Sequence, residues 1–472
     1  MTLEMFRPGG GESFSGGGGH GGGGGGGGGG FVLELLYWLL QLFIYHPLIA
    51  LVLVAIVAFL LWRQAREQRA NADWDSGPPT ALHKNIPLTA VANLDPEFSQ
   101  VVFEDFVYRL FSEAQRVRAS VEGLATIVPY VSEAARDALA QRPPVGMAVE
   151  QVIVGAQRVI DVALPAKRER GNNIEVTVEF EANVLTKDHT YYSVETWVFV
   201  RDVALRSKPP EISKVWRCPN CGAPWQASNT GSEVCQNCGQ AVANGRFDWY
   251  VDRIELKSVD ERGPTLTQDV KERGTDLPTY KDPERDDEWE ALVAADPDVT
   301  EPTVEHRLQM IYDLLNKAWS ANDLKTVRGF VSDGLFDYLQ YWVDAYKREG
   351  FRNQLTDMRI TNVEYAKVVR DKYYDAITIR FWAIGKDFVV KSATGQLVRG
   401  SKTRERAYSE YWTLMRAAGK KGVPKAEPVC GNCGAPLLVN ASGECEHCGA
   451  HVTAGEFDWV LSKIEQDDTY RG

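Results

Sequence analysis

No cysteine in this 472-residue chain lies outside two short clusters, so none is left over for a role unconnected with them. The chain also lacks a basic field. Its formal net charge is −12, and the stretch from Asp260 to Glu301 alone holds 14 acids and 5 bases, a net of −9. Contacts from Lys and Arg to phosphates dominate affinity for nucleic acids. We therefore expect no nucleic-acid partner.

The N-terminus lacks the basic stretch that leads directly into the apolar core of a signal peptide. Of the 42 glycines, 17 lie between Gly9 and Gly30. Such a tract cannot bury enough apolar surface to fold. We expect residues 1–30 to be a disordered glycine-rich tract, to which the sequence assigns no further task.

Residues 31–66 begin with an almost wholly apolar run and form the predicted membrane segment. A helix over residues 31–62 would be about 48 Å long, more than a bilayer core of about 30 Å requires. Pro47 offers a break, so the crossing helix is predicted at about residues 43–62. Arg63, Arg66 and Arg69 follow at once, and by the positive-inside rule the N-terminus faces out and the remaining chain is cytoplasmic.

The eight cysteines form four CxxC pairs, which make two groups of four. The first group is Cys218, Cys221, Cys235 and Cys238, and the second is Cys430, Cys433, Cys445 and Cys448. Thirteen residues separate the pairs of the first group and eleven those of the second. This spacing lets four thiolates converge on one tetrahedral zinc ion, and four sulfurs leave no open position for catalysis. We predict two structural zinc ions.

Glycines follow each pair, at positions 222, 239, 434 and 449. They fit a tight turn with positive φ that points backbone amides at the sulfurs. The competing interpretation is a set of disulfides, which a reducing cytoplasm disfavours. His447 and His451 lie close by and could also be ligands, but four sulfurs already complete each site.

Two segments of like construction follow the membrane segment. Each starts with amphipathic helices and continues with strands that have one buried face, such as Asn173–Val184. In the first segment Asp95-Pro96 is interpreted as a helix N-cap followed by proline. The predicted organisation is a tether at 67–94, a first domain at 95–258 with a zinc ribbon at 216–240, an acidic linker at 259–301, and a second domain at 302–466 with a zinc ribbon at 428–450.

The same short motifs recur in both segments. These are an acid–proline pair (Asp95-Pro96; Glu301-Pro302), Glu-x-Trp-x-x-x-Arg (Glu195, Trp197, Arg201; Glu410, Trp412, Arg416), and Trp-x-x-x-x-Ile after Phe-Asp (Trp249, Ile254; Trp459, Ile464). Together they resemble the C-terminal domain of the import-motor adaptor, subunit forty-four, of the mitochondrial inner-membrane translocase. The glycine tract before a membrane helix resembles bacterial membrane proteins that carry this domain. The tandem copies and inserted ribbons depart from the mitochondrial pattern.

This resemblance implies an α+β fold with two cone-shaped domains of the nuclear-transport-factor-two-like type, in which helices pack on a curved antiparallel sheet. Each domain would carry a four-cysteine zinc ribbon, and an N-terminal transmembrane helix would precede both. The implied function is a non-enzymatic binding or scaffold protein at the cytoplasmic face of the bacterial inner membrane, in protein transport or membrane-protein assembly. The membrane is the expected partner through one helix, and the sequence names no protein partner.

The alternative is an isomerase- or dehydratase-like enzyme with a pocket inside the cone, which needs a buried acid or base. Glu195 and Glu410 are its candidates, unless they are fold determinants paired with an arginine on a neighbouring strand. A lipid-binding role would rest on Arg116 and Arg118, which are more often a solvated face. Trp225 is either a protein-contact residue or packs on its own knuckle.

Overall fold

The computed structural model of this protein describes two segments of the chain, called here the first half (residues 85–262) and the second half (residues 275–472). Within them it describes residues 85–165, 172–208, 217–225, 233–242, 245–262, 275–425, 429–440, 443–450, 452–453, 455–467, 470 and 472. Tyr45, Pro47 and Phe59 are the other described residues. The predicted glycine tract and most of the membrane segment and of the tether therefore lie outside the described residues. Among those that are described, no helix is both long and apolar enough to cross a bilayer.

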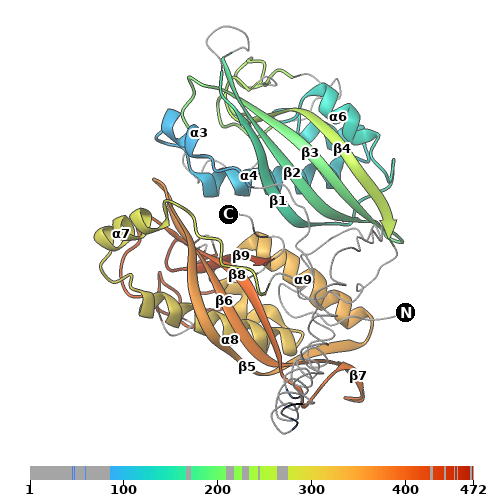
Figure 1. Ribbon diagram of the computed structural model, residues 1–472. Helices are drawn as coiled ribbons and strands as arrows, with labels where there is room; N and C mark the ends of the chain where they lie inside the picture. Colours follow the sequence, from blue (N-terminus) through green and yellow to red (C-terminus); the bar gives the residue numbers. More distant parts are fainter. Residues whose placement is uncertain are drawn as a thin grey trace. The chain divides into compact units, whose positions relative to one another are not determined.

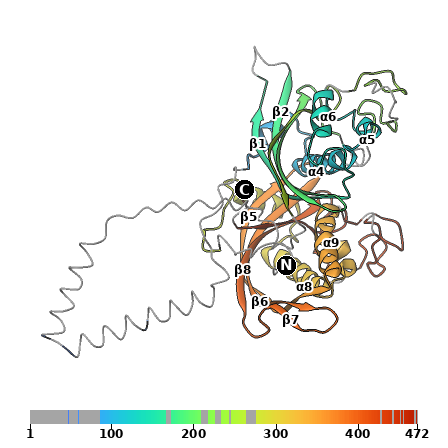
Figure 2. The same ribbon diagram turned by 90° about the vertical axis from the view of Figure 1, so that its right-hand side faces the viewer.

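The first half places four helices before a four-stranded antiparallel sheet. The helices are α3 (Thr89–Leu94), α4 (Gln100–Val117), α5 (Val121–Thr126) and α6 (Glu133–Ala140), and the strands are β1 (Gln151–Ala163), β2 (Asn173–Leu185), β3 (Thr190–Asp202) and β4 (Tyr250–Arg262). The sheet order is β1-β2-β3-β4. Helices α4, α5 and α6 lie on one face of it (Figures 1 and 2). The first cysteine group lies between β3 and β4.

The second half repeats this plan, and its first two strands are longer than those of the first half. Its helices are α7 (Arg285–Ala295), α8 (Glu301–Ser320), the 3₁₀ helix η2 (Leu324–Phe330) and α9 (Asp333–Arg348). Its strands are β5 (Phe351–Arg370), β6 (Tyr374–Lys391), β7 (Leu397–Gly400), β8 (Arg406–Ala417) and β9 (Val460–Gln466), in the antiparallel order β5-β6-β8-β9 with β7 paired to β6. The second cysteine group lies between β8 and β9. Both halves are therefore mixed α+β units with antiparallel sheets, in agreement with the predicted fold class at this level.

Apolar alternation builds each core between the sheet and its helices. In β2 the residues Ile174, Val176, Val178 and Phe180 are fully buried, as their spacing predicts. Phe180 packs on Trp197, with ring centroids 5.8 Å apart, and Phe381 packs on Trp412 in the second half at 5.1 Å. Equivalent strands thus bring equivalent aromatic side chains together.

The start of one helix is fixed to the last strand in the same way in both halves. Ser132 caps α6 and its backbone N–H donates to Val251 O, while Ser332 caps α9 and donates to Leu461 O, each at 2.9 Å. Serine at an N-cap satisfies an otherwise unpaired backbone N–H of the first turn. The matching contacts support the internal repeat seen in the sequence.

Three sequence-based expectations differ from the structure. Asp95 is not an N-cap: it follows α3, and Ser99 caps α4 by accepting from Val102 N at 3.2 Å. Residues 259–301, predicted as a linker, contain the end of β4 and all of α7. Strand β5 was not foreseen, because three register shifts interrupt its alternation and polar residues fill much of it.

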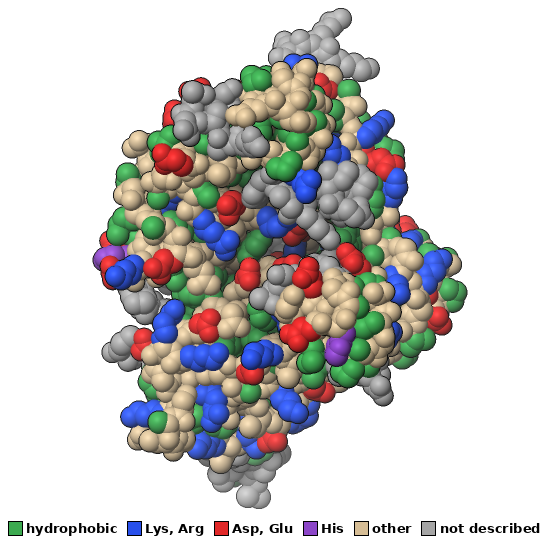
Figure 3. Space-filling view, turned by 180° about the vertical axis from the view of Figure 1, so that it is seen from behind, with side chains coloured by type: hydrophobic (Ala, Val, Ile, Leu, Met, Phe, Trp, Pro, Cys, Tyr) green, Lys and Arg blue, Asp and Glu red, His purple; other side chains and the backbone are tan. Residues whose placement is uncertain are grey.

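Charged side chains of both signs are scattered over one face of the described structure. In Figure 3, Lys and Arg side chains lie among Asp and Glu side chains over the face drawn. The formal net charge of −12 is therefore not gathered into one acidic surface on this face.

Candidate metal centres

Each CxxC pair folds into a tight backbone turn that brings its two sulfurs to the same side. Cys218 N donates to Ala223 O at 2.9 Å, and Gly222 N donates back to Cys218 O at 2.9 Å. The same pair of bonds recurs in the other three turns. The glycine after each pair has φ between +68° and +73°, at positions 222, 239, 434 and 449. This confirms the predicted positive φ, which a residue with a Cβ adopts at a cost.

The eight cysteines form two compact clusters of four, and all eight are free. In each cluster the sulfurs lie within 4.8 Å of one another. Cys218 Sγ lies 3.9 Å from Cys238 Sγ, and Cys433 Sγ lies 4.0 Å from Cys445 Sγ. A disulfide needs about 2.05 Å, whereas zinc–sulfur bonds of about 2.3 Å in a tetrahedron place sulfurs roughly 3.8 Å apart. Both clusters thus fit a tetrahedral metal ion, and zinc suits their four thiolates.

Asparagine side chains reach across each cluster to a sulfur of the opposite turn. Asn237 Nδ2 donates to Cys221 Sγ at 3.4 Å, and Asn432 Nδ2 donates to Cys448 Sγ at 3.5 Å. The Asn237 bond is the main reason that the pKa of Cys221 falls to about 6. The pKa of Cys448 also falls to about 6, mainly because of a hydrogen bond from the Ala450 backbone N–H and secondly because of the bond from Asn432. A lower pKa favours the thiolate form that binds metals at these two sulfurs, whereas burial raises the pKa of Cys218 to about 12.

The structure describes one of the two histidines near the second cluster. His447 is exposed and lies in the fourth turn, between Cys445 and Cys448. His451 lies outside the described residues. The described cluster consists of Cys430, Cys433, Cys445 and Cys448 alone.

The first ribbon is fixed to its own half by polar contacts from helices and from the end of the sheet. Trp225 Nε1 donates to Ala125 O, at the end of α5, at 3.0 Å, and its ring packs against the buried cysteines. Tyr130 Oη donates to Arg217 O at 2.9 Å. Lys208 Nζ donates to Pro219 O at 2.6 Å and to Phe247 O at 3.0 Å. Trp225 therefore packs on its own knuckle and also binds the knuckle to α5.

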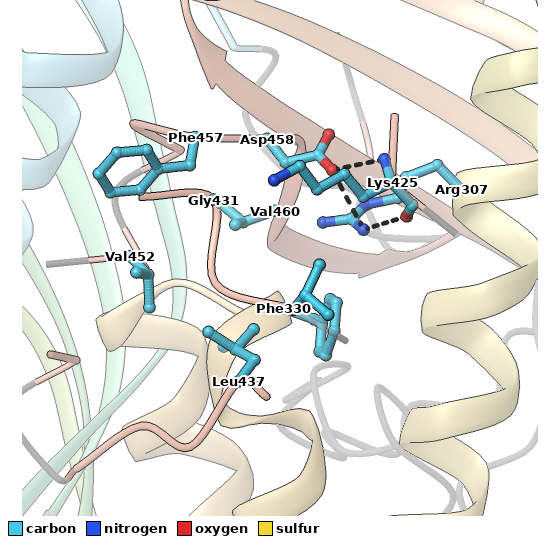
Figure 4. Close-up of a pocket in the computed structure, with 11 residues that line it drawn as sticks. Arg307, Phe330, Lys425, Gly431, Leu437, Val452, Phe457, Asp458 and Val460 are labelled. Carbon is cyan, nitrogen blue, oxygen red and sulfur yellow. Dashed lines mark hydrogen bonds and ion pairs between the residues drawn. The ribbon is translucent and has the colours of Figure 1, made fainter. Parts of the chain in front are cut away.

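The second ribbon contacts its half around a small cavity. Figure 4 shows Phe330, Leu437 and Val452 on one side of it, with Arg307 and Asp458 on the other. The cavity has a volume of about 20 Å³, enough for about one water molecule. A Cβ on Gly329, in η2, would lie 2.9 Å from Leu437 Cγ, so any larger residue here would force the Leu437 side chain to shift.

The chain returns from each ribbon through Gly-x-Phe-Asp-Trp. Gly245 and Gly455 have φ of +69° and +72°, and their carbonyls accept from the ends of β3 and β8. Asp248 then accepts from its neighbour Trp249 N at 2.9 Å. The arginine of the Glu-x-Trp-x-x-x-Arg motif lies over the following tryptophan: Arg201 is 4.7 Å from the Trp249 ring centroid, and Arg416 over Trp459 repeats this at 4.5 Å. The recurring motifs are thus one structural unit that closes the ribbon.

Both motif arginines form buried ion pairs with an aspartate that the sequence did not single out for this role. Arg201 Nη2 lies 2.9 Å from Asp95 Oδ2, and Arg416 Nη1 lies 2.9 Å from Asp296 Oδ2. The counterpart of Asp95-Pro96 is therefore Asp296-Pro297, not Glu301-Pro302. This equivalence could have been predicted from the sequence, because each Asp-Pro pair begins four residues before a helix N-cap, Ser99 or Thr300.

The two candidate catalytic carboxylates bond to the tryptophan two residues on. Trp197 Nε1 donates to Glu195 Oε2 at 3.0 Å, and Trp412 Nε1 donates to Glu410 Oε2 at 2.9 Å. Gln115 Nε2 also donates to Glu195, at 2.8 Å. An arginine does approach Glu195, but Arg142 follows α6 and is not on a neighbouring strand as expected. These contacts support the structural interpretation of both glutamates.

Arg118, one of the two residues considered for lipid contact, faces the interior. It is 4% exposed and donates to the backbone carbonyls of Arg142 and Pro143. Burial lowers the pKa of its guanidinium to about 10. The structure therefore contradicts a lipid site made by Arg116 and Arg118 together.

Comparison with known protein families finds a Tim44-like domain at residues 288–424. The matched range runs from within α7 to the loop after β8 and ends before Cys430. No curated protein matches the chain. At a coarse level, such a domain suggests an adaptor in protein translocation at a membrane. The second half of this chain thus contains a Tim44-like domain, and a four-cysteine cluster follows it.

Proposed function

We propose that this protein is a membrane-anchored, non-enzymatic adaptor or scaffold, acting at the cytoplasmic face of a bacterial inner membrane. Its Tim44-like domain supports a role in protein transport or membrane-protein assembly. Residues 31–66 anchor it in a single pass, with the N-terminus outside. The apolar run and the arginines that follow it support this topology.

Both halves would be domains of the nuclear-transport-factor-two-like type. The Tim44-like match supports this for the second half. For the first half, the support is its equivalent sheet, the aspartate–arginine pair and the Ser132 and Ser332 contacts with the last strand. Two linked copies raise avidity when a partner presents two sites that the connection can span.

Each ribbon would hold one structural zinc ion. The observation that carries this is the close approach of the sulfurs in each cluster. The Sγ atoms of Cys218 and Cys238, Cys221 and Cys235, Cys430 and Cys448, and Cys433 and Cys445 lie 3.8 to 4.0 Å apart. Four thiolates fill the coordination sphere, so the ion fixes the fold of the ribbon and leaves no position for a substrate. The ribbon in turn fixes the hairpin made by the two strands that flank it.

A binding role also suits the chemistry of the buried carboxylates. A catalytic base must reach a substrate proton. Glu195 and Glu410 instead accept hydrogen bonds from tryptophan side chains inside the protein and are 2% and 1% exposed. The small cavity beside Arg307 admits about one water molecule and does not suit an organic substrate.

The experiment compares the full chain with a variant that lacks residues 31–66 in bacterial membranes. We expect the full chain to resist alkaline extraction and the variant to be soluble. A photocrosslinker at the exposed Leu438 or Val423 should capture the same membrane-embedded transport or insertion proteins from independent preparations. Soluble full-length chain would refute the anchor. The adaptor role would be refuted if the crosslinker captured no protein that is absent from a control without the crosslinker.

A further inference from the structure

The two cysteine clusters differ in a residue next to their sulfurs. In the first, Asn220 Nδ2 donates to Cys238 Sγ and Asn237 Nδ2 donates to Cys221 Sγ, each at 3.4 Å. In the second, Asn432 makes the bond equivalent to that of Asn220. His447 occupies the position of Asn237. Among the described contacts, His447 donates to no sulfur, so the second cluster has one side-chain N–H···S bond where the first has two.

Exposure differs in the same direction. Each cluster has two buried cysteines, the first of each CxxC pair. Of the other two, Cys221 and Cys433 are exposed in both clusters, but Cys238 is half-buried whereas its counterpart Cys448 is exposed. The second cluster therefore presents two exposed cysteines to solvent, where the first presents one.

Both differences weaken the hold on a metal. Four thiolates around a divalent ion leave a net charge of −2 on the centre, spread over the sulfurs. N–H donors stabilise that charge and orient the ligands, and losing such an outer contact typically costs 10- to 100-fold in metal affinity. Exposed sulfurs are also the ones that a chelator or an electrophile reaches first.

We propose that the second centre, formed by Cys430, Cys433, Cys445 and Cys448, is the labile one of the pair. It releases its metal to a competing chelator before the first centre does, and His447 in place of an asparagine is the main cause. This inference rests on the proposed binding of one zinc ion by each cluster.

Metal loss at this centre would act on a defined contact surface. Leu437 and Val439, between its two CxxC pairs, lie against Gly329 of η2. Thr453 Oγ1 donates to Asp333 Oδ1, at the start of α9, at 2.8 Å. Release of the metal therefore frees the second ribbon from η2 and α9, while the first ribbon keeps its contacts with α5.

The test uses the zinc-loaded full chain in detergent with excess 4-(2-pyridylazo)resorcinol, a chromogenic chelator. Parallel samples are labelled with N-ethylmaleimide and digested for mass spectrometry. We expect two release phases, with Cys433 and Cys448 labelled in the fast one. His447→Asn should slow the fast phase about 10-fold, and Asn237→His should accelerate the slow phase by about the same factor.

Glu446→Gln is the matched control, because Glu446 precedes His447 where Gln236 precedes Asn237. This variant should leave the order of release unchanged. The inference is overturned if the first cluster is labelled first, if both release in one phase, if the His447 and Asn237 exchanges have no effect, or if Glu446→Gln alone equalises the phases. A zinc content well below two per chain before chelation would instead refute the proposed metal sites.

Discussion

Arg416 and Asp296 form a buried ion pair between the end of β8 and the residue that follows α7, with Nη1 and Oδ2 2.9 Å apart. Asp296 also accepts from Gly422 N at 3.1 Å, in the chain segment that leads to the second ribbon. The guanidinium of Arg416 lies over the Trp459 ring. This ion pair therefore connects the end of α7, the end of β8 and Trp459, which precedes β9.

Removing one partner of this pair should strongly destabilise the second half. Asp296→Asn removes the closer of two buried counter-charges of Arg416 and leaves Asp375, whose Oδ2 lies 3.8 Å from Arg416 Nη2. Removing one partner of a buried ion pair typically costs about 3–5 kcal/mol. Hydrogen exchange of β8 peptides in the full chain measures the loss. The exposed pair Arg359–Glu405 is the control, since solvent screens such a pair and Arg359→Ala should leave the exchange of β8 nearly unchanged. Equal effects of the two changes would contradict a central role for Arg416.

Acid should destabilise the first half through Asp95. Burial opposes ionisation of this carboxylate, but hydrogen bonds from Ser207 and the charge of Arg201 lower its pKa below 3.8. Because the folded-state pKa is depressed, the stabilisation is present above the unfolded pKa and is lost as pH falls through the folded value. We expect Asp95→Asn to flatten the loss of unfolding free energy below pH about 4. Asp188→Asn, in an exposed turn, should keep the wild-type slope.

Glu195→Gln should lower the free energy of unfolding, and we expect no enzymatic turnover in either the wild type or the variant. The carboxylate accepts from both Trp197 and Gln115 in the core, and weakening such charged hydrogen bonds costs about 1–3 kcal/mol. Urea unfolding measures the loss of stability, and Glu255→Gln, at an exposed position of β4, is the control. Conversion of a small molecule by the wild type but not by Glu195→Gln would support the enzyme alternative instead.

Gly329→Ala should loosen the second ribbon. The added Cβ would lie 2.9 Å from Leu437 Cγ and 3.1 Å from Val439 Cγ2, and such overpacking costs about 1–3 kcal/mol. Leu437→Ala removes the obstacle, so the double variant should recover part of the loss. Proteolysis between Cys433 and Cys445 reports on the ribbon. If the effects of Gly329→Ala and Leu437→Ala simply add, the new Cβ at position 329 does not contact Leu437.

Removing the metal should unfold both ribbons and leave the sheets in place. A ligand that binds only the folded state stabilises it by mass action. We expect about two zinc ions per chain in the purified protein. Chelation should break the Trp225–Ala125 contact and shift tryptophan emission, an effect that Trp225→Phe should reduce. A metal-free protein with disulfides between its cysteines would contradict the zinc sites.

The parts of the fold that sequence predicts well are those set by local spacing. The CxxC turns, the positive φ of their glycines and the alternation in β2 follow from neighbouring residues. The contacts of Glu195 with Gln115, of Arg201 with Asp95 and of Arg416 with Asp296 do not, because each joins residues at least 80 positions apart. Strand β5 escaped detection because its bulges break the period of two on which the prediction depends.

The ribbons begin and end at residues that the sheet already holds together. Asp202 N donates to Gly245 O at 3.1 Å, and Ala417 N donates to Gly455 O at 2.9 Å. The sheet therefore places no demand on the length of the excursion, which explains how thirteen residues in one copy and eleven in the other separate the CxxC pairs while both hairpins close in the same way. Each excursion can therefore differ in length without a change in the pairing of the two strands that flank it.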